Sequence, residues 1–375
     1  MKEGNVMASL ILDSLKILNF RTFHHLQIER LGRVNLIVGK NNVGKTSLLE
    51  ALWLYARRGS PEIIRYILEK RNEIRRTAAD ERRQIQPQFS DIRHLFYGRE
   101  AVEMRSGASA HIVAGHTGLL SITVDWFVRQ AARSQSGYKL VPYQESSNIT
   151  SEKMLGLEIN MESQREDRFL VEDIFNPSRT HLLEVEDAYP AIFVSASGIT
   201  RTEVEAFWDG IALTDREKDL IEALQIIAPE VERLNLIGNR ASNENRIPAV
   251  KLKHYDGPVN LSSLGEGMNR MFTIALALVN AGAGMLLIDE IENGLHYTVQ
   301  PDMWRLIFAV AHRLNVQVFA ATHSWDCIAA FQQAANEHAE EGMLIRLENR
   351  DGDIVTTLFD ERRMGIAARE DIEVR

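Results

Sequence analysis

A short glycine-rich stretch, VGKNNVGKTSLLEAL at residues 38–52, constrains this chain more than any other part of its sequence. Gly39, Gly44, Lys45 and Thr46 fill the pattern G-x-x-x-x-G-K-[ST]. In that pattern the glycines let backbone N–H groups close on phosphates, the lysine reaches the terminal phosphates, and the hydroxyl ligates Mg²⁺. The stretch therefore predicts a site for ATP or GTP.

The segments on either side are those that a phosphate-binding loop needs. Before the loop, RVNLIVG at residues 33–39 is a short apolar run with β-branched residues, which predicts a strand. After it, KTSLLEALWLYARR has apolar residues at helical spacing. This order points a helix N-terminus at the phosphates. The residues expected to bind the nucleotide here are Gly39, Asn41, Asn42, Gly44, Lys45, Thr46 and Ser47.

Composition limits the classes of function. The 375 residues are 45% hydrophobic and 25% charged with a net charge of −9, so any nucleic-acid contact must use a local basic patch. The single cysteine, Cys327, excludes an internal disulfide and a cysteine-rich zinc site. The N-terminus has no signal-peptide pattern, and the longest uncharged run, residues 271–288, is interrupted by NAGAG. We read that run as a buried helix, a turn and a buried strand, and we expect a cytoplasmic protein without membrane spans.

The rest of the chain divides by pattern. Residues 9–31 alternate in two short runs and predict a β-hairpin or a meander, while residues 105–195 are rich in strand patterns. Residues 201–240 read as helical, and the C-terminal part reads as two strands around an Asp-Gly turn. Residues 57–83 hold nine basic and five acidic side chains. That segment is either a solvated helical face or a contact for DNA or a partner.

A second motif, GMLLIDEIENGLH at residues 284–296, supplies the acidic half of a nucleotide site. Its apolar run predicts a buried strand, and Asp289 lies at the end of that strand, where a carboxylate can meet the metal together with Thr46. We therefore expect Thr46 and Asp289 to bind Mg²⁺, and Glu290 to polarise the attacking water.

A third motif, LSSLGEGMNR at residues 261–270, contains Ser263, Leu264, Gly265 and Glu266. These four residues resemble the S-x-G-E/Q signature of ABC-type ATPases. In that family the serine hydroxyl and glycine N–H groups, at a helix N-terminus, grip the γ-phosphate bound by the partner subunit. The alternative is a plain helix cap, because serine in this position caps helices well.

A fourth motif, VQVFAATHSWD at residues 316–326, is an apolar run that ends in Thr322, His323 and Ser324. His323 matches the switch histidine of ABC-type sites, which senses the γ-phosphate. The segment ENGLH at residues 292–296 fits the segment that crosses the dimer seam in the same family.

With four motifs in order, the chain resembles ABC-type P-loop ATPases of the group that holds the OLD (overcoming lysogenization defect) ATPases, the RecF-type repair ATPases and the heads of structural-maintenance-of-chromosomes (SMC) proteins. LKILNFRTFHHLQIERLGRVNLIVGKNNVGKTSLLEAL and LLIDEIENGLHY are most similar to stand-alone OLD-like bacterial ATPases. The resemblance covers nearly the whole chain and is weak only over residues 57–190. It implies an α/β fold: a central, mostly parallel sheet, N-terminal antiparallel strands and a helical signature lobe.

On this resemblance we expect one ABC-type head over residues 1–375. Its expected parts are the N-terminal strands, phosphate loop and first helix (8–58), an insert that is first basic and helical and then strand-rich (59–200), a helical lobe with the signature (201–280), and the acidic strand, seam segment, switch histidine and C-terminal strands (281–375).

Two departures from the family pattern stand out. There is no unambiguous Q-loop, since the candidates Gln84, Gln86 and Gln88 have strands after them rather than before. The signature has Leu264 where transporters have glycine, and Gly267 is added.

The resemblance implies ATP hydrolysis with Mg²⁺ in a homodimer or a higher homo-oligomer. One subunit would supply the phosphate loop, Asp289 and the catalytic residues Lys45, Glu290 and His323. The other would supply Ser263, Gly265 and Glu266, so that ATP acts as a clamp between the two.

The sequence leaves four possible uses of such an ATPase to compare. The lack of membrane spans argues against transport, and the lack of sustained heptads between Thr46 and Ser263 argues against a chromosome-organising coiled coil. Only 52 residues follow His323, too few for the Toprim nuclease domain of a self-contained OLD protein. The fourth use is an ATPase that regulates something outside its own chain, and it has two versions. One is a switch that regulates a separately encoded effector, such as a Toprim-like nuclease in phage defence, and the other is a RecF-type factor in DNA repair. The first is preferred because the motifs are closest to the OLD-like group.

Replacing Lys45 by alanine is expected to abolish ATP binding, because Lys45 supplies the only side-chain cation that the motif aims at the β- and γ-phosphates. Isothermal calorimetry with ATP checks this. Near-normal affinity in the variant would contradict the assignment of the site.

Overall fold

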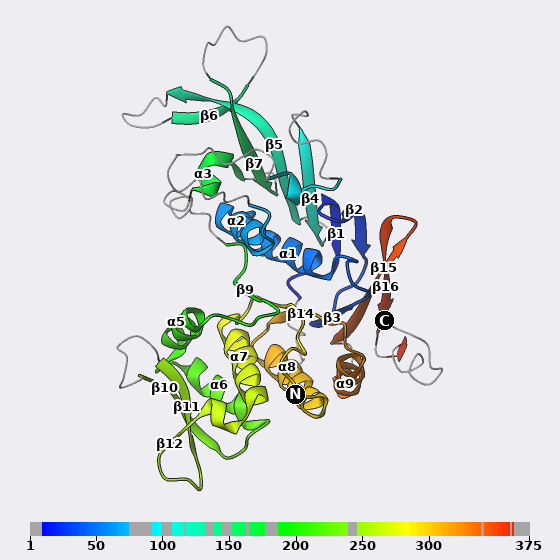
Figure 1. Cartoon of the computed structure of the whole chain (residues 1–375). Helices are drawn as coiled ribbons and strands as arrows, with labels where there is room; N and C mark the ends of the chain where they lie inside the picture. The colour runs from blue at the N-terminus through cyan, green and yellow to red at the C-terminus, as the bar shows by residue number, and fades with distance from the viewer. Residues whose placement is uncertain are drawn as a thin grey trace, which may run out of the picture.

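The computed structural model describes residues 10–74, 92–98, 107–115, 118–131, 138–143, 152–162, 165–176, 187–238, 246–338, 341–360 and 362–363. The described residues form three β-sheets and the helices that pack on them (Figure 1). The Q-loop candidates Gln84, Gln86 and Gln88 lie outside these residues, and so do residues 75–83 of the basic segment.

The central sheet holds the phosphate-loop strand. Its strand order is β16-β15-β3-β14-β13-β9. All neighbouring strands pair in parallel except the edge strand β16. The bounds are β3 (Val34–Val38), β9 (Ala191–Val194), β13 (Met285–Ile288), β14 (Gln317–Ala321), β15 (Gly342–Arg350) and β16 (Asp353–Phe359). The α/β fold with a mostly parallel sheet is as predicted.

This sheet is buried on both faces, which explains why its inner strands are continuous apolar runs. Leu36 and Ile288 face a core made with α7 (Glu266–Asn280), α8 (Gln300–Arg313) and α9 (Trp325–Ala335). Ile37 and Leu287 face the opposite core, which α1 (Lys45–Ala56) covers. In Figure 1, α1 lies above the central strands and α7, α8 and α9 lie below them. The run at residues 271–288 is α7, a turn and β13, as the sequence predicts.

A second, antiparallel sheet stacks over α1. It has the order β2-β1-β4-β5-β7-β8, with β6 also paired to β5. Its strands are β1 (Leu15–Phe20), β2 (Phe23–Ile28), β4 (Ala108–Ala114), β5 (Gly118–Ala131), β6 (Tyr138–Pro142), β7 (Met154–Met161) and β8 (Arg165–Leu170). The predicted N-terminal hairpin is therefore confirmed as β1 and β2. It is not a separate element, because β1 also pairs with β4 from the expected insert.

Short helices and one strand of the central sheet complete the expected insert. The helices are α2 (Pro61–Lys70), the 3₁₀ helix η1 (Ile92–Leu95) and α3 (Val171–Phe175). Strand β9 follows them in the chain but pairs with β13, so it belongs to the central sheet.

The signature lobe lies on the α7 side of the central sheet (Figure 1). It contains α5 (Arg201–Ile211) and α6 (Asp215–Gln225), followed by β10 (Val231–Gly238), β11 (Arg246–Leu252), β12 (Pro258–Asn260) and the 3₁₀ helix η2 (Leu261–Leu264). The prediction of helix over residues 201–240 is wrong after residue 225. In VERLNLIG, Leu234 and Leu236 are buried two residues apart, which is the period of a strand, and an irregularity between Val231 and Arg233 accounts for the three-residue step from the buried Val231.

None of the helices in the described part of the chain combines the length and the apolar character that crossing a membrane requires.

Gln317 ties the first described residues to the sheet and gives a test of the fold. Its buried amide donates to the carbonyl oxygens of Leu12 and Gly32, each at 2.8 Å, and accepts from the Leu12 N–H at 2.9 Å. Gln317→Met leaves the N–H and the carbonyl oxygen of Leu12 without these partners, whereas the Gly32 carbonyl oxygen keeps its hydrogen bond from Asn35 Nδ2. The free energy of unfolding should therefore fall by about 2–4 kcal/mol, at roughly 1–3 kcal/mol per unsatisfied group.

Urea denaturation measures this loss. The matched control is Gln27→Met on β2, where the side chain is exposed and the change should be below about 0.5 kcal/mol. Equal losses in the two variants would show that the Gln317 hydrogen bonds do not hold the N-terminal segment.

Candidate nucleotide-binding site

The carboxyl ends of four parallel strands meet at one edge of the central sheet, which is where ligands bind in open α/β sheets. The phosphate loop follows β3, and Asp289 follows β13. His323 comes two residues after β14, and Ser195 follows β9. The structure thus brings together at one edge three of the four predicted motifs, and adds the loop after β9.

Steric limits explain the glycines of the phosphate loop. Gly39 has φ 145° and Gly44 has φ 96°, both outside the usual range of L side chains. A Cβ atom on Gly39 would lie 2.4 Å from the Leu347 carbonyl oxygen, and one on Gly44 would lie 2.6 Å from Thr22 Oγ1. Both positions therefore require glycine for close backbone approach.

The loop leaves the start of α1 open to a ligand. Gly44 is the N-cap of α1, and no side chain caps this helix. Asn41 and Asn42 are exposed, and Lys45 Nζ donates to the carbonyl oxygens of Gly39 at 2.7 Å and Lys40 at 3.1 Å. Unused N–H groups at a helix N-terminus favour anions. Binding of nucleotide by these residues remains a prediction that this geometry fits.

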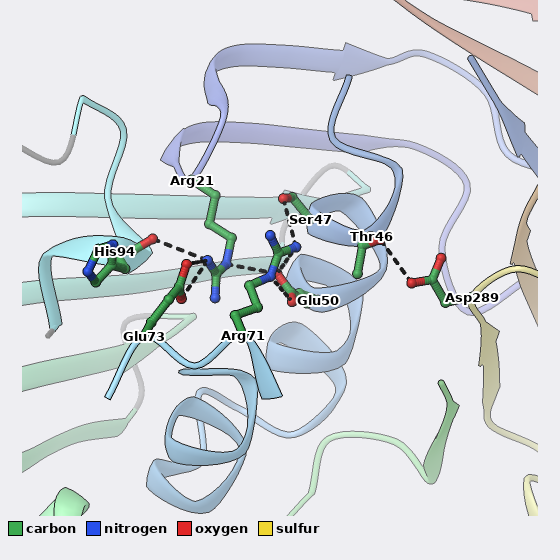
Figure 2. A network of polar contacts seen from close by, with 8 residues as sticks. All are labelled: Arg21, Thr46, Ser47, Glu50, Arg71, Glu73, His94 and Asp289. Carbon is green, nitrogen blue, oxygen red and sulfur yellow. Dashed lines mark hydrogen bonds and ion pairs between the residues drawn. The ribbon is translucent and has the colours of Figure 1, made fainter. Parts of the chain in front are cut away.

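Thr46 and Asp289 meet across the site although they are far apart in sequence. Thr46 Oγ1 donates to Asp289 Oδ2 at 2.9 Å (Figure 2). Burial raises the pKa of Asp289 above its ordinary value, the hydrogen bond from Thr46 lowers it, and the neighbouring Glu290 raises it further. A hydroxyl and a carboxylate are oxygen donors of the kind that Mg²⁺ accepts, so the pair fits the predicted metal site.

The acidic turn after β13 is braced by its own residues. The backbone of Glu290 has φ 47°, an angle that is uncommon for residues other than glycine or asparagine. Asn293 Nδ2 donates to Glu290 Oε2 at 2.7 Å and to the Ala196 carbonyl oxygen at 3.2 Å. The turn is thereby tied to the loop after β9, and the Glu290 carboxylate is held in place.

His323 is tied to the same turn. The nearly buried Glu292 Oε1 accepts from the His323 backbone N–H at 3.1 Å and lies 3.2 Å from His323 Nδ1. The sequence pattern marks Glu292 and Asn293 only as part of ENGLH, the predicted seam segment, and indicates neither their contact with His323 nor that with Glu290.

The signature residues are not part of this cluster. Ser263, Gly265 and Glu266 are exposed at the start of α7. Gly265 is the N-cap of α7 with φ 106°, and no side chain caps the helix, so the alternative of a serine cap is wrong. Among the described residues, no hydrogen bond joins Ser263 to the phosphate loop.

A network of buried charges lies behind the phosphate loop (Figure 2). Glu50 on α1 forms ion pairs with Arg21 Nε and Arg71 Nε, both at 2.8 Å. Arg21 Nη1 pairs with Glu73 at 3.0 Å, and Arg71 Nη2 donates to Ser47 Oγ at 3.3 Å. Burial raises the pKa of Glu50 and lowers that of Arg21, while each ion pair acts in the opposite direction.

Three of the arginines in residues 57–74, the described part of the basic segment, pair with carboxylates of the same chain. Arg71 is occupied by Glu50 and Ser47, and Arg57 pairs with Asp187 at 2.6 Å. Arg65 faces Glu69 at 3.4 Å, one helical turn away. These arginines are therefore neutralised by carboxylates within the molecule. The spacing of the sequence carries no signal for the contact between residues 50 and 71.

The amino-acid sequence is similar to those of known proteins. A family model described as “AAA domain, putative AbiEii toxin, Type IV TA system” matches residues 34–326. A protein of Helicobacter pylori named “ATP/GTP phosphatase” is 24% identical over 350 residues, which cover 87% of this chain and 89% of that protein.

Two further similarities are shorter or more distant. The “DNA replication and repair protein RecF” of Clostridioides difficile is 46% identical over 43 residues, 12% of each chain. The solved “SMC head domain from Thermotoga maritima” is 12% identical with a TM-score of 0.44, covering 93% of this chain and 99% of that one.

Glu50→Gln should lower the free energy of unfolding by about 3–5 kcal/mol, because it leaves the guanidinium of Arg21, whose side chain is 2% exposed, short of a partner. Urea denaturation measures the loss. The control Glu172→Gln breaks the exposed ion pair with Arg129 and should cost about 1 kcal/mol or less. A loss at Glu50 no larger than at Glu172 would mean that the buried network does not hold α1.

Proposed function

This chain belongs to the family of P-loop ATPases described as “AAA domain, putative AbiEii toxin, Type IV TA system”, and we propose that it acts within that family as an ATP-driven switch. The protein is an ATPase. In the proposed cycle two copies close around two ATP molecules, and hydrolysis opens them. The closed and open forms would regulate a separately encoded effector protein.

One observation supports the proposal of a dimer: within one subunit, the residues at the sheet edge and the exposed start of α7 are two separate halves of the expected ATP site. Gly39–Thr46, Asp289, Glu290 and His323 share the edge, whereas Ser263 and its neighbours make no hydrogen bond to the phosphate loop among the described residues. The uncapped N-terminus of α7 offers N–H groups and a positive helix dipole to an anion. A second copy could bring that terminus to the γ-phosphate.

Roles for the side chains follow from this arrangement. Lys45 would leave its loop carbonyls for the β- and γ-phosphates, and Mg²⁺ held by Thr46 and Asp289 would neutralise charge on the phosphates. Glu290, held by Asn293, would orient the attacking water. His323, held by Glu292, would face the γ-phosphate. The partner's α7 N-terminus would stabilise the charge that develops there.

Two uses of the switch are each supported by a different similarity. The family description names “putative AbiEii toxin, Type IV TA system”, which supports work with a separately encoded protein. The OLD-like defence role rests on the sequence motifs at residues 38–52 and 284–296. The 43-residue similarity to a RecF protein supports the alternative of a DNA repair mediator. A DNA contact through residues 57–83 gains no support from Arg57, Arg65 or Arg71, which pair internally. Capture of a nuclease-like protein by an ATP-locked form would favour the first use, and capture of replication proteins the second.

Glu290→Gln should bind ATP normally yet turn it over about 10²–10⁴-fold more slowly, since it removes the general base while the phosphate contacts stay. The variant should then accumulate as an ATP-bound dimer. Light scattering and crosslinking across the seam, with and without Mg·ATP, measure this.

Ser263→Arg added to Glu290→Gln should undo the dimer, because it places bulk and charge in the seam without touching the variant's own phosphate loop. If ATP changes neither mass nor crosslinking, or if Ser263→Arg has no effect, the signature assignment is wrong.

A further inference from the structure

A buried arginine links the signature helix to the acidic turn. Arg270 lies on α7, one helical turn after Glu266, and is 9% exposed. Its Nη2 donates to the Glu290 carbonyl oxygen at 3.4 Å. A Cβ atom on Gly198 would lie 3.4 Å from its Nη1, so the loop after β9 lies beside the guanidinium. The side chain therefore touches the backbone of the residue proposed to orient the water.

Arg270 and the buried carboxylate of Glu292 attract each other electrostatically. Burial lowers the pKa of Arg270, and the attraction of Glu292 raises it. Glu292 is 8% exposed, and its Oε1 is already used by His323. In the part of the chain that the structure describes, Glu292 Oε2 and Arg270 Nε both lack a hydrogen-bond partner. These two opposite charges are buried and attract each other without a direct bond.

Such an arrangement favours movement toward a bonded pair. A buried charged group in which one polar atom lacks a hydrogen bond is costly, so a small shift of α7 that joins Arg270 Nε to Glu292 Oε2 would lower the free energy. The same shift would pull on the Glu290 backbone and, through Glu292, on His323. Because α7 is one packed element, a force on its N-terminus reaches Arg270 within a single helical turn.

We infer that Arg270 is a positioning residue that transmits the engagement of the signature helix to Glu290 and to the Glu292–His323 pair of the same subunit. The inference rests on the proposed dimer and goes beyond it. When the N-terminus of α7 engages the γ-phosphate held by the partner, Arg270 would set the acidic turn of its own subunit for hydrolysis. The two ATP sites would thus be coupled through α7.

Arg270→Gln is the first test. It removes the charge but no group of the phosphate loop, so the dissociation constant for ATP should stay within about twofold while kcat falls by about 10- to 100-fold, the range for misplaced catalytic groups. Arg270→Lys keeps the charge beside Glu292 and should recover most of kcat. The double variant Arg270→Gln with Glu292→Gln should lose no more than the worse of the two single variants, because both break one link.

Arg33→Gln is the matched control. Arg33 is also a buried arginine, 7% exposed, and its Nη1 donates to Asn315 Oδ1 at 2.9 Å. It precedes β3, at the end of the sheet opposite the site. This variant should lose stability in urea denaturation and keep wild-type kcat. If Arg270→Gln does not fold, Arg270→Lys and Glu292→Gln are tested in its place, by circular dichroism, kcat and ATP affinity. Glu292→Gln is then expected to show normal ATP affinity and a lower kcat.

Three results would overturn the inference. The first is wild-type kcat in Arg270→Gln or, if that variant does not fold, wild-type kcat in Glu292→Gln. The second is a loss of kcat in Arg33→Gln equal to the loss in Arg270→Gln. The third is a double variant whose loss of kcat is the product of the two single losses. Glu290→Gln in the same assay separates this from failure of the proposed function. Normal turnover in Glu290→Gln refutes the proposed catalytic role, whereas slow turnover there with normal turnover in the Arg270 variants refutes only the coupling.

Discussion

Parallel pairing of β3, β14, β13 and β9 is the constraint on which the rest of this structure depends. Parallel strands all end at the same edge, so the loops after them converge without any contact between the loops being required first. The sheet must also be covered on both faces, which α1 does on one side and α7, α8 and α9 do on the other. The phosphate loop, the acidic turn and the switch histidine therefore meet because their strands are neighbours.

Charged side chains in the interior refine this edge. Arg21, Glu50 and Arg71 fix α1 against the antiparallel sheet and α2, directly behind Thr46 and Ser47 (Figure 2). On the other side, Glu292 fixes His323 to the acidic turn. Burying charge contributes little net stability, but removing one member of a buried pair is strongly destabilising. Such pairs therefore hold the geometry of the edge, where small displacements matter most for chemistry.

The two ends of α7 serve different purposes. Its C-terminal part is buried against the central sheet, whereas its first residues are exposed and uncapped. A helix whose core-facing part is rigid and whose terminus is open can bind an anion and carry the resulting force inward. That division gives the proposed switch a physical route through the subunit.

Local features of this protein were predictable from sequence alone. The phosphate loop, the β1–β2 hairpin and β13 depend on neighbours in the chain, on glycine at Gly39 and Gly44 and on apolar periodicity, so their patterns are complete within about 15 residues. The pairing of Thr46 with Asp289 also followed, because both motifs end or begin at strands of known kind. The strand at residues 231–238 was missed because it directly follows two true helices, and its period of two was absorbed into theirs.

Tertiary structure alone decided the rest. The place of β9 in the central sheet depends on its pairing with β13, almost a hundred residues later in the chain. The partners of Glu50, Glu292 and Arg270 come from other elements, and nothing in their spacing marks them. Charged residues in a sequence look alike whether they are solvated or buried. Only the packing of the elements determines which of them lose water, and a charge without water must find its partner in space rather than in sequence.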